Sequence, residues 1–304
     1  MSVLELIGRT PMVRLERIHP RIYAKCEHLN PGGSVKDRLA LAIVRAAEAD
    51  GQLHPGSTMV EATAGNTGLG LALLAAVRGY RLVCVLPEKM CEDKRVALRA
   101  AGAEVVVTPN APLDSPENFR NVAARLAREK GWFLTDQFAH PANPRIHEQT
   151  TGPEVLEQVP EVAAFVAGAG TGGTLTGVGR FFRRVRPGLR MVLADPVGSG
   201  LAHWLETGVP GPDGAYQLEG IGSSQPPPNL DRDSLDEVEV VSDQESFAMT
   251  RRLIREEGLL VGGSSGTAVA AACRVVERVE GPVVALLADS WDRYLSRGWL
   301  VEGD

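Results

Sequence analysis

A lysine stands at the end of a turn rich in Pro and Gly, directly before an apolar segment with helical spacing. The stretch, residues 30–38, reads Asn-Pro-Gly-Gly-Ser-Val-Lys-Asp-Arg. Gly32 and Gly33 permit backbone angles that other residues resist, and Ser34 is a favourable N-cap for the following helix. Lys36 then lies in the first turn, where the helix dipole disfavours a cation and favours the neutral amine. A neutral amine can attack a carbonyl, so Lys36 is a candidate for covalent chemistry; the alternative is an ordinary surface lysine.

Two further turns, each between an apolar run and a helix-like segment, offer groups that bind a ligand. The first, residues 63–68, reads Thr-Ala-Gly-Asn-Thr-Gly. Free N–H groups at a helix start, with hydroxyls and an amide beside them, form a cradle for a carboxylate. The second, residues 262–266, is Gly-Gly-Ser-Ser-Gly before an Ala-rich segment. Each turn by itself is equally compatible with an ordinary loop.

A third turn, residues 168–174, reads Gly-Ala-Gly-Thr-Gly-Gly-Thr and allows two interpretations. Its threonines and consecutive N–H groups suit a phosphate dianion without any Lys or Arg. Its glycines also match G-x-G-x-x-G, and Asp195 follows where a dinucleotide-binding fold places its ribose-binding acid. The dinucleotide alternative, however, leaves Lys36 and the turn at residues 63–68 without a role.

The elements that must position these residues form an alternating pattern along the chain. Short apolar runs alternate with helix-periodic segments, which predicts an α/β fold with parallel-rich twisted sheets covered by helices. Residues 205–228 are rich in Gly and Pro and are expected to form a loop. We expect strands at residues 22–25, 58–61, 82–86, 104–107, 132–134, 164–167, 191–194 and 283–288, and helices at residues 39–49, 69–79, 94–101, 119–130, 174–184, 246–257 and 268–279.

The composition is that of a globular protein of 304 residues, with 44% hydrophobic and 23% charged residues. A net charge of -6 argues against a nucleic-acid partner, since no basic surplus neutralises phosphates. We expect no metal site, because the six histidines do not cluster in metal-ligand spacing. No signal peptide or membrane-length apolar run is apparent. The scattered cysteines fit a reducing compartment, so we expect a cytoplasmic enzyme; they are Cys26, Cys84, Cys91 and Cys273.

In their order and spacing, these motifs resemble the cysteine synthase and cystathionine β-synthase family of pyridoxal-phosphate (PLP) enzymes. The resemblance extends from residue 7 to residue 289. It implies fold type II, similar to the tryptophan synthase β-subunit, with two domains. The smaller, mobile domain would comprise residues 35–141 and carry the substrate loop. Residues 1–34 and 142–304 would form the larger domain, with the phosphate and pyridine-nitrogen sites.

The resemblance also implies a role for each motif residue. Lys36 corresponds to the lysine that forms the Schiff base with the cofactor and serves as catalytic base. Asn66 would contact the 3′-oxygen of the cofactor and Ser264 its pyridine nitrogen. A serine there does not stabilise a protonated ring, which favours rapid β-elimination. The phosphate cup would be Gly170, Thr171, Gly172, Gly173 and Thr174, and the substrate-binding residues Thr63, Ala64, Gly65, Thr67, Gln137 and Gly220.

The implied reaction is β-replacement on an activated serine: O-acetyl-L-serine and sulfide give L-cysteine and acetate through an α-aminoacrylate intermediate. Residues 30–33, 143–147, 150–154 and 292–296 resemble cysteine synthases, whereas residues 87–90, 114–117 and 219–222 resemble cystathionine β-synthases. Because the chain ends at Asp304, we expect neither a regulatory extension nor an N-terminal haem segment. We favour cysteine synthase. The alternatives are cystathionine β-synthase, acting on serine and homocysteine, and a cysteine synthase that uses O-phosphoserine or thiosulfate.

Two positions depart from the family pattern. Ala64 stands where serine is common, which removes one hydroxyl from the carboxylate loop and is expected to weaken substrate binding. Cys91 also replaces a usual serine, and we expect a buried, inert thiol. The resemblance further implies a homodimer. A complex with a serine acetyltransferase is compatible with it, although no residue pattern in the chain identifies one.

Overall fold

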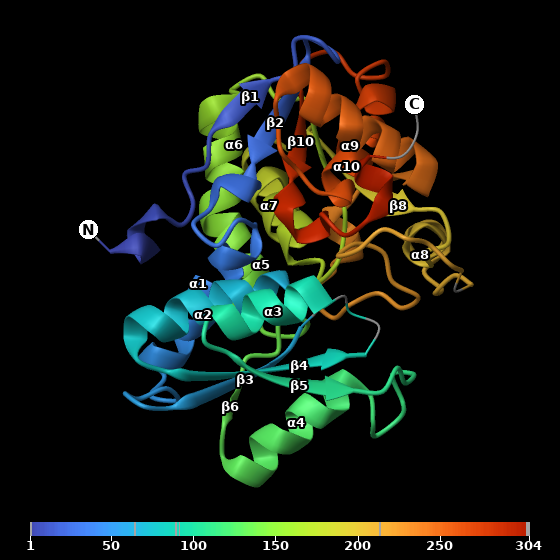
Figure 1. The fold of residues 1–304 in the computed structure, drawn as a ribbon. Coiled ribbons are helices and arrows are strands. Elements are labelled where there is room, and N and C mark those ends of the chain that lie inside the picture. Colours follow the sequence, from blue (N-terminus) through green and yellow to red (C-terminus); the bar gives the residue numbers. More distant parts are fainter. Residues whose placement is uncertain (1, 64, 89, 91, 213, 302–304) are drawn as a thin grey trace. The chain divides into compact units, whose positions relative to one another are not determined.

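The computed structural model describes residues 2–63, 65–88, 90, 92–212 and 214–301. The chain forms two compact units, each with its own sheet (Figure 1). Unit 1 consists of Met1–Ile7 and Asn30–Ala142, and unit 2 of Gly8–Leu29 and Asn143–Asp304. Movement of residues 35–141 as one domain stays a prediction.

Unit 1 is built on a four-stranded parallel sheet in the order β5-β4-β3-β6. Three helices, α1, α2 and α3, contribute to a core on one face of this sheet, and α4 packs on the other (Figure 1). The short 3-10 helix Val3–Leu6 adds Leu4 to the first core. The elements are α1 (Lys36–Ala49), β3 (Thr58–Ala62), α2 (Asn66–Arg78), β4 (Arg81–Pro87), α3 (Glu92–Ala100), β5 (Glu104–Thr108), α4 (Phe119–Lys130) and β6 (Phe133–Leu134).

Unit 2 is built on a six-stranded sheet in the order β1-β2-β10-β7-β8-β9, parallel except for the antiparallel pair β1 and β2. Helices α9 and α10 pack together over one face of this sheet (Figure 1). The elements are β1 (Met12–Arg14), β2 (Ile22–Cys26), α5 (Ala142–Ile146), a π-helical turn (His147–Thr151), α6 (Gly152–Gln158), β7 (Ala164–Ala167), α7 (Gly173–Val185), β8 (Arg190–Pro196), α8 (Leu201–Thr207), β9 (Glu237–Val241), α9 (Asp243–Glu257), α10 (Gly263–Val275), β10 (Val283–Leu287) and the 3-10 helices Glu27–Leu29, Arg232–Ser234, Trp291–Tyr294 and Gly298–Leu300.

The predicted α/β class with parallel sheets is confirmed, and the largest corrections concern α10 and the sheet edges. Helix α10 begins at Gly263 and ends at Val275, not at residues 268 and 279. The Gly/Ser run reads as a loop in sequence, but its residues are buried, and packing overrides their low helix propensity. Strands β1 and β9 were not predicted, because these edge strands are only partly buried and lack a continuous apolar run. Helix α8 occupies the start of the predicted loop at residues 205–228.

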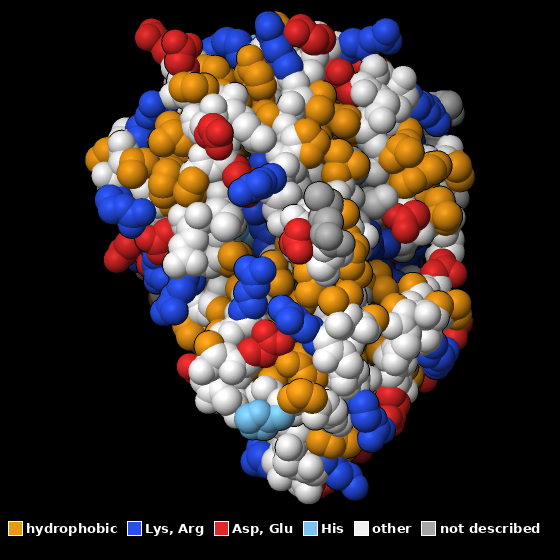
Figure 2. Space-filling view, turned by 90° about the vertical axis from the view of Figure 1, so that its left-hand side faces the viewer, with side chains coloured by type: hydrophobic (Ala, Val, Ile, Leu, Met, Phe, Trp, Pro, Cys, Tyr) orange, Lys and Arg blue, Asp and Glu red, His pale blue; other side chains and the backbone are white. Residues whose placement is uncertain are grey.

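Charged side chains of both signs are mixed on the surface. On the face shown in Figure 2, Lys and Arg lie interspersed with acidic and hydrophobic side chains. Among the residues that the structure describes, no helix has the length and apolar character needed to cross a bilayer. The same part of the chain holds no group of three or more His, Cys, Asp or Glu side chains placed to bind a metal ion.

Candidate active site

Lys36 is the first residue of α1 in unit 1. The predicted N-cap, Ser34, is wrong by one residue: Val35 occupies the cap with helical angles, so the cap lacks a side-chain acceptor. The Ser34 hydroxyl instead accepts the Lys36 N–H at 3.2 Å. Buried Asp37 accepts the Gly32 N–H at 2.6 Å. This contact ties the turn to the helix start and so fixes the place of the half-buried Lys36.

The turn after β3 folds around the hydroxyl of Thr63. This oxygen accepts the N–H groups of Gly65 at 3.0 Å and Gly68 at 3.3 Å. Gly65 has φ +136°, a conformation that L side chains rarely adopt. Asn66 and Thr67 are the first two residues of α2, so the structure brings four predicted residues together at one helix start. A helix start of this kind presents N–H donors to an anion.

Gln137, which is predicted to bind the substrate, lies beside this turn. Its side-chain oxygen accepts the Thr67 hydroxyl at 2.6 Å. Its amide nitrogen donates to Glu61 Oε1 and to the Ala62 carbonyl, each at 2.9 Å. These bonds orient the amide, so Gln137 holds the Thr67 side chain in place.

Glu61 is a site residue that the sequence reasoning missed. It is fully buried at the end of β3, where its carboxyl group also contacts the Thr135 hydroxyl. Burial is the largest effect on its pKa and raises it to about 7, against the lowering by hydrogen bonds from Thr135 and Gln137. The available signal was a carboxylate inside an otherwise apolar strand, two residues before a candidate turn. Ala64 and Cys91, the two departures from the family pattern, lie outside the described residues.

In unit 2, the predicted phosphate cup occupies the loop between β7 and α7. Gly172 has φ +81° and immediately precedes the helix. The first bond into the helix runs from the Thr176 N–H to the Gly172 carbonyl at 3.1 Å. The N–H groups of the first helical residues therefore point out of the helix start, as a phosphate requires.

Two side chains from the preceding helices hold the threonines of the cup. Asn143 donates to the Thr171 hydroxyl at 2.9 Å. The Nε2 atom of His147 lies 3.3 Å from the Thr174 hydroxyl. A Cβ at Gly173 would collide with the amide of Asn143, so glycine lets α5 approach the cup. Asn143 and His147 belong to residues 143–147, for which the sequence predicted a family resemblance but no contact with the cup.

Gly220 lies directly against the cup. A Cβ at Gly170 would collide with the Gly220 carbonyl. The Gly222 N–H donates to the Ala169 carbonyl at 2.9 Å, which joins the two loops. The structure therefore places the predicted substrate-side glycine beside the predicted phosphate site.

Ser264 is the second residue of α10 and is 6% exposed. The residue before α10, Gly262, donates its N–H to the Asp289 carbonyl at 3.0 Å. Asp289 follows β10, which pairs in parallel with β7. Ser264 and the cup therefore lie at the same edge of the sheet, where the carboxyl ends of parallel strands meet and ligands commonly bind.

Asp195, on which the dinucleotide alternative depended, does not serve an open ligand site. It is fully buried in β8, and its Oδ2 atom accepts the Ala202 N–H of α8 at 2.9 Å. Burial raises its pKa to about 6. Its position indicates a structural role at the start of α8.

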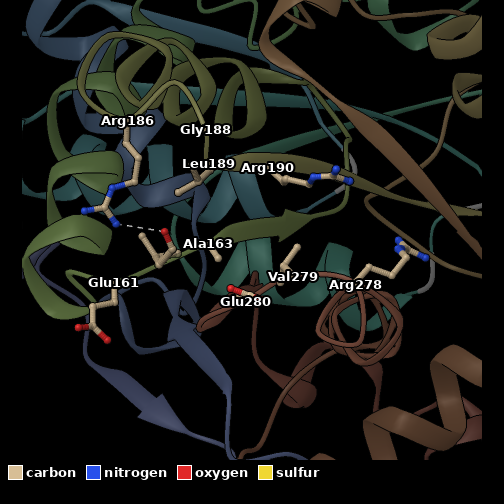
Figure 3. A pocket seen from close by; sticks show the side chains of 10 residues that line it. Glu161, Ala163, Arg186, Gly188, Leu189, Arg190, Arg278, Val279 and Glu280 are labelled. Atoms are coloured by element: carbon tan, nitrogen blue, oxygen red, sulfur yellow. Dashed lines mark hydrogen bonds between the residues drawn. The ribbon is translucent and has the colours of Figure 1, made fainter.

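A hollow of about 360 Å³ opens at the other end of the same sheet, where β7 and β8 begin (Figure 3). Three arginines line it, but each already has a partner. Arg186 donates to the Val162 carbonyl at 3.2 Å, and Arg190 and Arg278 pair with Glu237 at 3.5 and 3.4 Å. The hollow contains none of the predicted site residues.

The chain is similar to known proteins over almost its whole length. The sequence family described as "Pyridoxal-phosphate dependent enzyme" matches residues 3–289. A cystathionine beta-synthase of Rattus norvegicus is 46% identical over 307 residues, which cover 97% of this chain and 54% of that protein. The chain thus spans about half the length of this relative.

Two further proteins are similar to this chain over almost the whole length of both chains. A cysteine synthase of Staphylococcus aureus (strain Mu50 / ATCC 700699) is 41% identical over 303 residues, which cover 97% of this chain and 95% of that protein. The crystal structure of an O-ureido-L-serine synthase matches with a TM-score of 0.92 and 40% identity, over 100% of this chain and 96% of that one.

Proposed function

Because the chain belongs to the family of pyridoxal-phosphate-dependent enzymes, we propose that it catalyses β-replacement on O-acetyl-L-serine, with sulfide as the incoming nucleophile. The dependence on PLP and the type II fold follow from the family. The observation that carries the proposal is the cup at the start of α7, where N–H groups and two threonine hydroxyls suit a phosphate. The donor set of the chain thus fits PLP.

The proposed roles follow the chemistry of each group. When bound, PLP draws electrons from the α-carbon of the substrate, which allows a group to leave from the β-carbon. Lys36 would bind the cofactor aldehyde through Nζ and would move the α-proton. The cup residues would hold the phosphate, Ser264 would hydrogen-bond the pyridine nitrogen, and Asn66 would contact the 3′-oxygen.

The substrate carboxylate is assigned to the turn after β3. The N–H groups at the start of α2 bind it, and Gln137, which accepts the Thr67 hydroxyl, holds this helix start in position. Gly220 lines the substrate side of the cup. Closure of the smaller domain on the bound carboxylate would exclude water from the reacting atoms.

The choice of O-acetylserine and sulfide rests on the segment that holds the cup. Asn143 and His147, which contact the cup threonines, belong to residues 143–147, which resemble cysteine synthases. The second candidate is serine with homocysteine. It is favoured by residues 219–222, which resemble cystathionine β-synthases and contact the cup at Gly170.

A substrate panel tests the proposal. Purified holoenzyme is given O-acetylserine, O-phosphoserine, O-ureidoserine or serine, each with sulfide, thiosulfate or homocysteine. We expect the highest kcat/KM with O-acetylserine and sulfide. Faster turnover of serine with homocysteine would replace this assignment by the second candidate.

The assignment of Lys36 has a spectroscopic test. We expect an absorbance band near roughly 410 nm, typical of PLP bound to lysine, and its loss in Lys36→Ala. A Lys36→Ala variant that retains the band would refute the assignment. We also propose that the protein is a cytoplasmic homodimer. Sedimentation of the holoenzyme tests the oligomeric state.

A further inference from the structure

Residues 291–300, near the end of the described chain, contact two of the segments that carry the unit 2 part of the proposed site. We call this stretch, with its 3-10 helices Trp291–Tyr294 and Gly298–Leu300, the C-terminal clasp. None of the roles proposed above involves it. Its contacts run to the loop of Gly220, to α9 and to the start of α10.

The first contact, with the loop of Gly220, is an ion pair, and beside it Trp299 stacks on Phe247 of α9. Arg297 Nη2 lies 2.6 Å from Glu219 Oε1, next to Gly220 in the chain. The Trp299 ring stacks on Phe247 with centroids 4.5 Å apart and planes 8° apart. Leu218 belongs to the same small cluster, so the clasp holds the loop on both sides of Glu219.

The loop transmits its position directly to the cup. The Gly220 carbonyl fills the space that a Cβ at Gly170 would need. Ile221 likewise fills the space beside Gly168. Because the Gly220 backbone and the Ile221 side chain lie directly against these two glycines, a displacement of the loop must change the shape of the cup edge.

The second contact reaches the start of α10. The Tyr294 hydroxyl donates to Asp289 Oδ2 at 2.7 Å. The carbonyl of Asp289 accepts the Gly262 N–H, and a Cβ at Gly262 would lie 2.6 Å from the Tyr294 ring. Tyr294 thereby packs against the residue that introduces the helix of Ser264.

We propose that the C-terminal clasp positions the substrate side of the site, and that Arg297, acting through Glu219, is the positioning residue for Gly220. The inference rests on the proposed function. The pair is partly exposed, at 38% for Arg297 and 17% for Glu219. Pairs of this kind contribute little to folding stability, so the loss of this one is expected to relax the loop while the fold remains intact.

The test compares Arg297→Ala with Arg252→Ala. The control removes an arginine of similar exposure, paired with Glu256 at 2.8 Å within α9 and without a contact to the loop among those described. In Arg297→Ala we expect KM for the amino-acid substrate to rise about fivefold or more while kcat changes less than about twofold. The control is expected to keep both values, and Arg297→Lys, which keeps the charge, to recover part of the loss.

A second readout does not depend on activity. In the protein without substrate, amide hydrogen exchange over residues 216–222 is expected to be faster in Arg297→Ala than in wild type and unchanged in the control. If Arg297→Ala had the KM of the wild type and the same amide hydrogen exchange over residues 216–222, the proposal would be overturned. Failure of the proposed function is distinguishable, because the wild-type protein would then turn over O-acetylserine and sulfide poorly, whereas hydrogen exchange in Arg297→Ala would still report on the loop.

Discussion

At the scale of single residues, Glu61 shows how burial gives an ordinary side chain an unusual property. Its carboxyl group lies inside the sheet of unit 1 and still contacts Gln137, which holds Thr67. The Thr135 hydroxyl lies 3.1 Å from the Val60 carbonyl and can donate to it. In that arrangement a protonated Glu61 can donate to the same hydroxyl. The neutral acid therefore fits its surroundings, in agreement with the raised pKa.

This predicts a pH-dependent stability. The pKa of Glu61 is about 7 in the folded protein against an ordinary 4.5, so folding favours its protonated form. The stabilisation of the fold by protonated Glu61 is complete below pH 4.5 and is lost as the pH rises through about 7. Relative to Glu61→Gln, the wild-type free energy of unfolding should fall by about 3 kcal/mol over this interval. Denaturant titrations at several pH values measure it, and parallel curves for the two proteins would contradict it.

Gly65 offers a second test at this scale. Its φ of +136° makes any side chain strained, and the turn it shapes carries the proposed carboxylate site. We expect Gly65→Ala to lose about 1–3 kcal/mol of stability and at least about tenfold in kcat/KM. Gly79→Ala, at φ +75° with no atom within 4 Å of the new Cβ, should lose some stability but keep its activity. Equal kinetic losses in the two variants would show that the turn has no special role.

At the scale of elements, the sequence predicted the fully buried strands and the longer helices, whereas the short helices α5, α6 and α8 were not predicted. The strand at residues 164–167 and the helix at residues 119–130 have the predicted bounds, because apolar runs and helical periodicity dominate there. The candidate turns at residues 63–68 and 168–174 follow β3 and β7 and lead into α2 and α7 for the same reason. The start of α10 and the approach of Asn143 to the cup depend on contacts between distant segments, which local patterns do not encode.

The contact between α5 and the cup predicts the effect of one methyl group. In Gly173→Ala the new Cβ would displace the amide of Asn143, which holds Thr171. We expect PLP to bind at least about tenfold more weakly, as measured by titration of the apo-protein. Gly188→Ala is the matched control in the same unit, because its Cβ meets no atom within 4 Å. If Gly173→Ala bound PLP with wild-type affinity, the assignment of the phosphate to this loop would be wrong.

At the scale of the whole molecule, each unit has its own hydrophobic core. Leu71 belongs to the core of unit 1 and Val284 lies in the sheet of unit 2, both fully buried. Proteins with separate cores often depart from two-state unfolding. We expect two calorimetric transitions. Leu71→Ala should lower the midpoint temperature of one, and Val284→Ala that of the other. Leu71→Ala should lower the free energy of unfolding by about 2–5 kcal/mol. A single transition that both variants shift together would show that the units unfold as one.

The close contacts at the cup glycines have a consequence for directed evolution. Gly173 leaves no room for a methyl group while Asn143 is present, and Gly170 leaves none while Gly220 keeps its place. Libraries that vary one of these positions at a time should therefore find each glycine intolerant. Saturating Gly173 together with Asn143 gives access to combinations in which a smaller partner admits a larger residue. Altered leaving-group preference is best sought among such pairs.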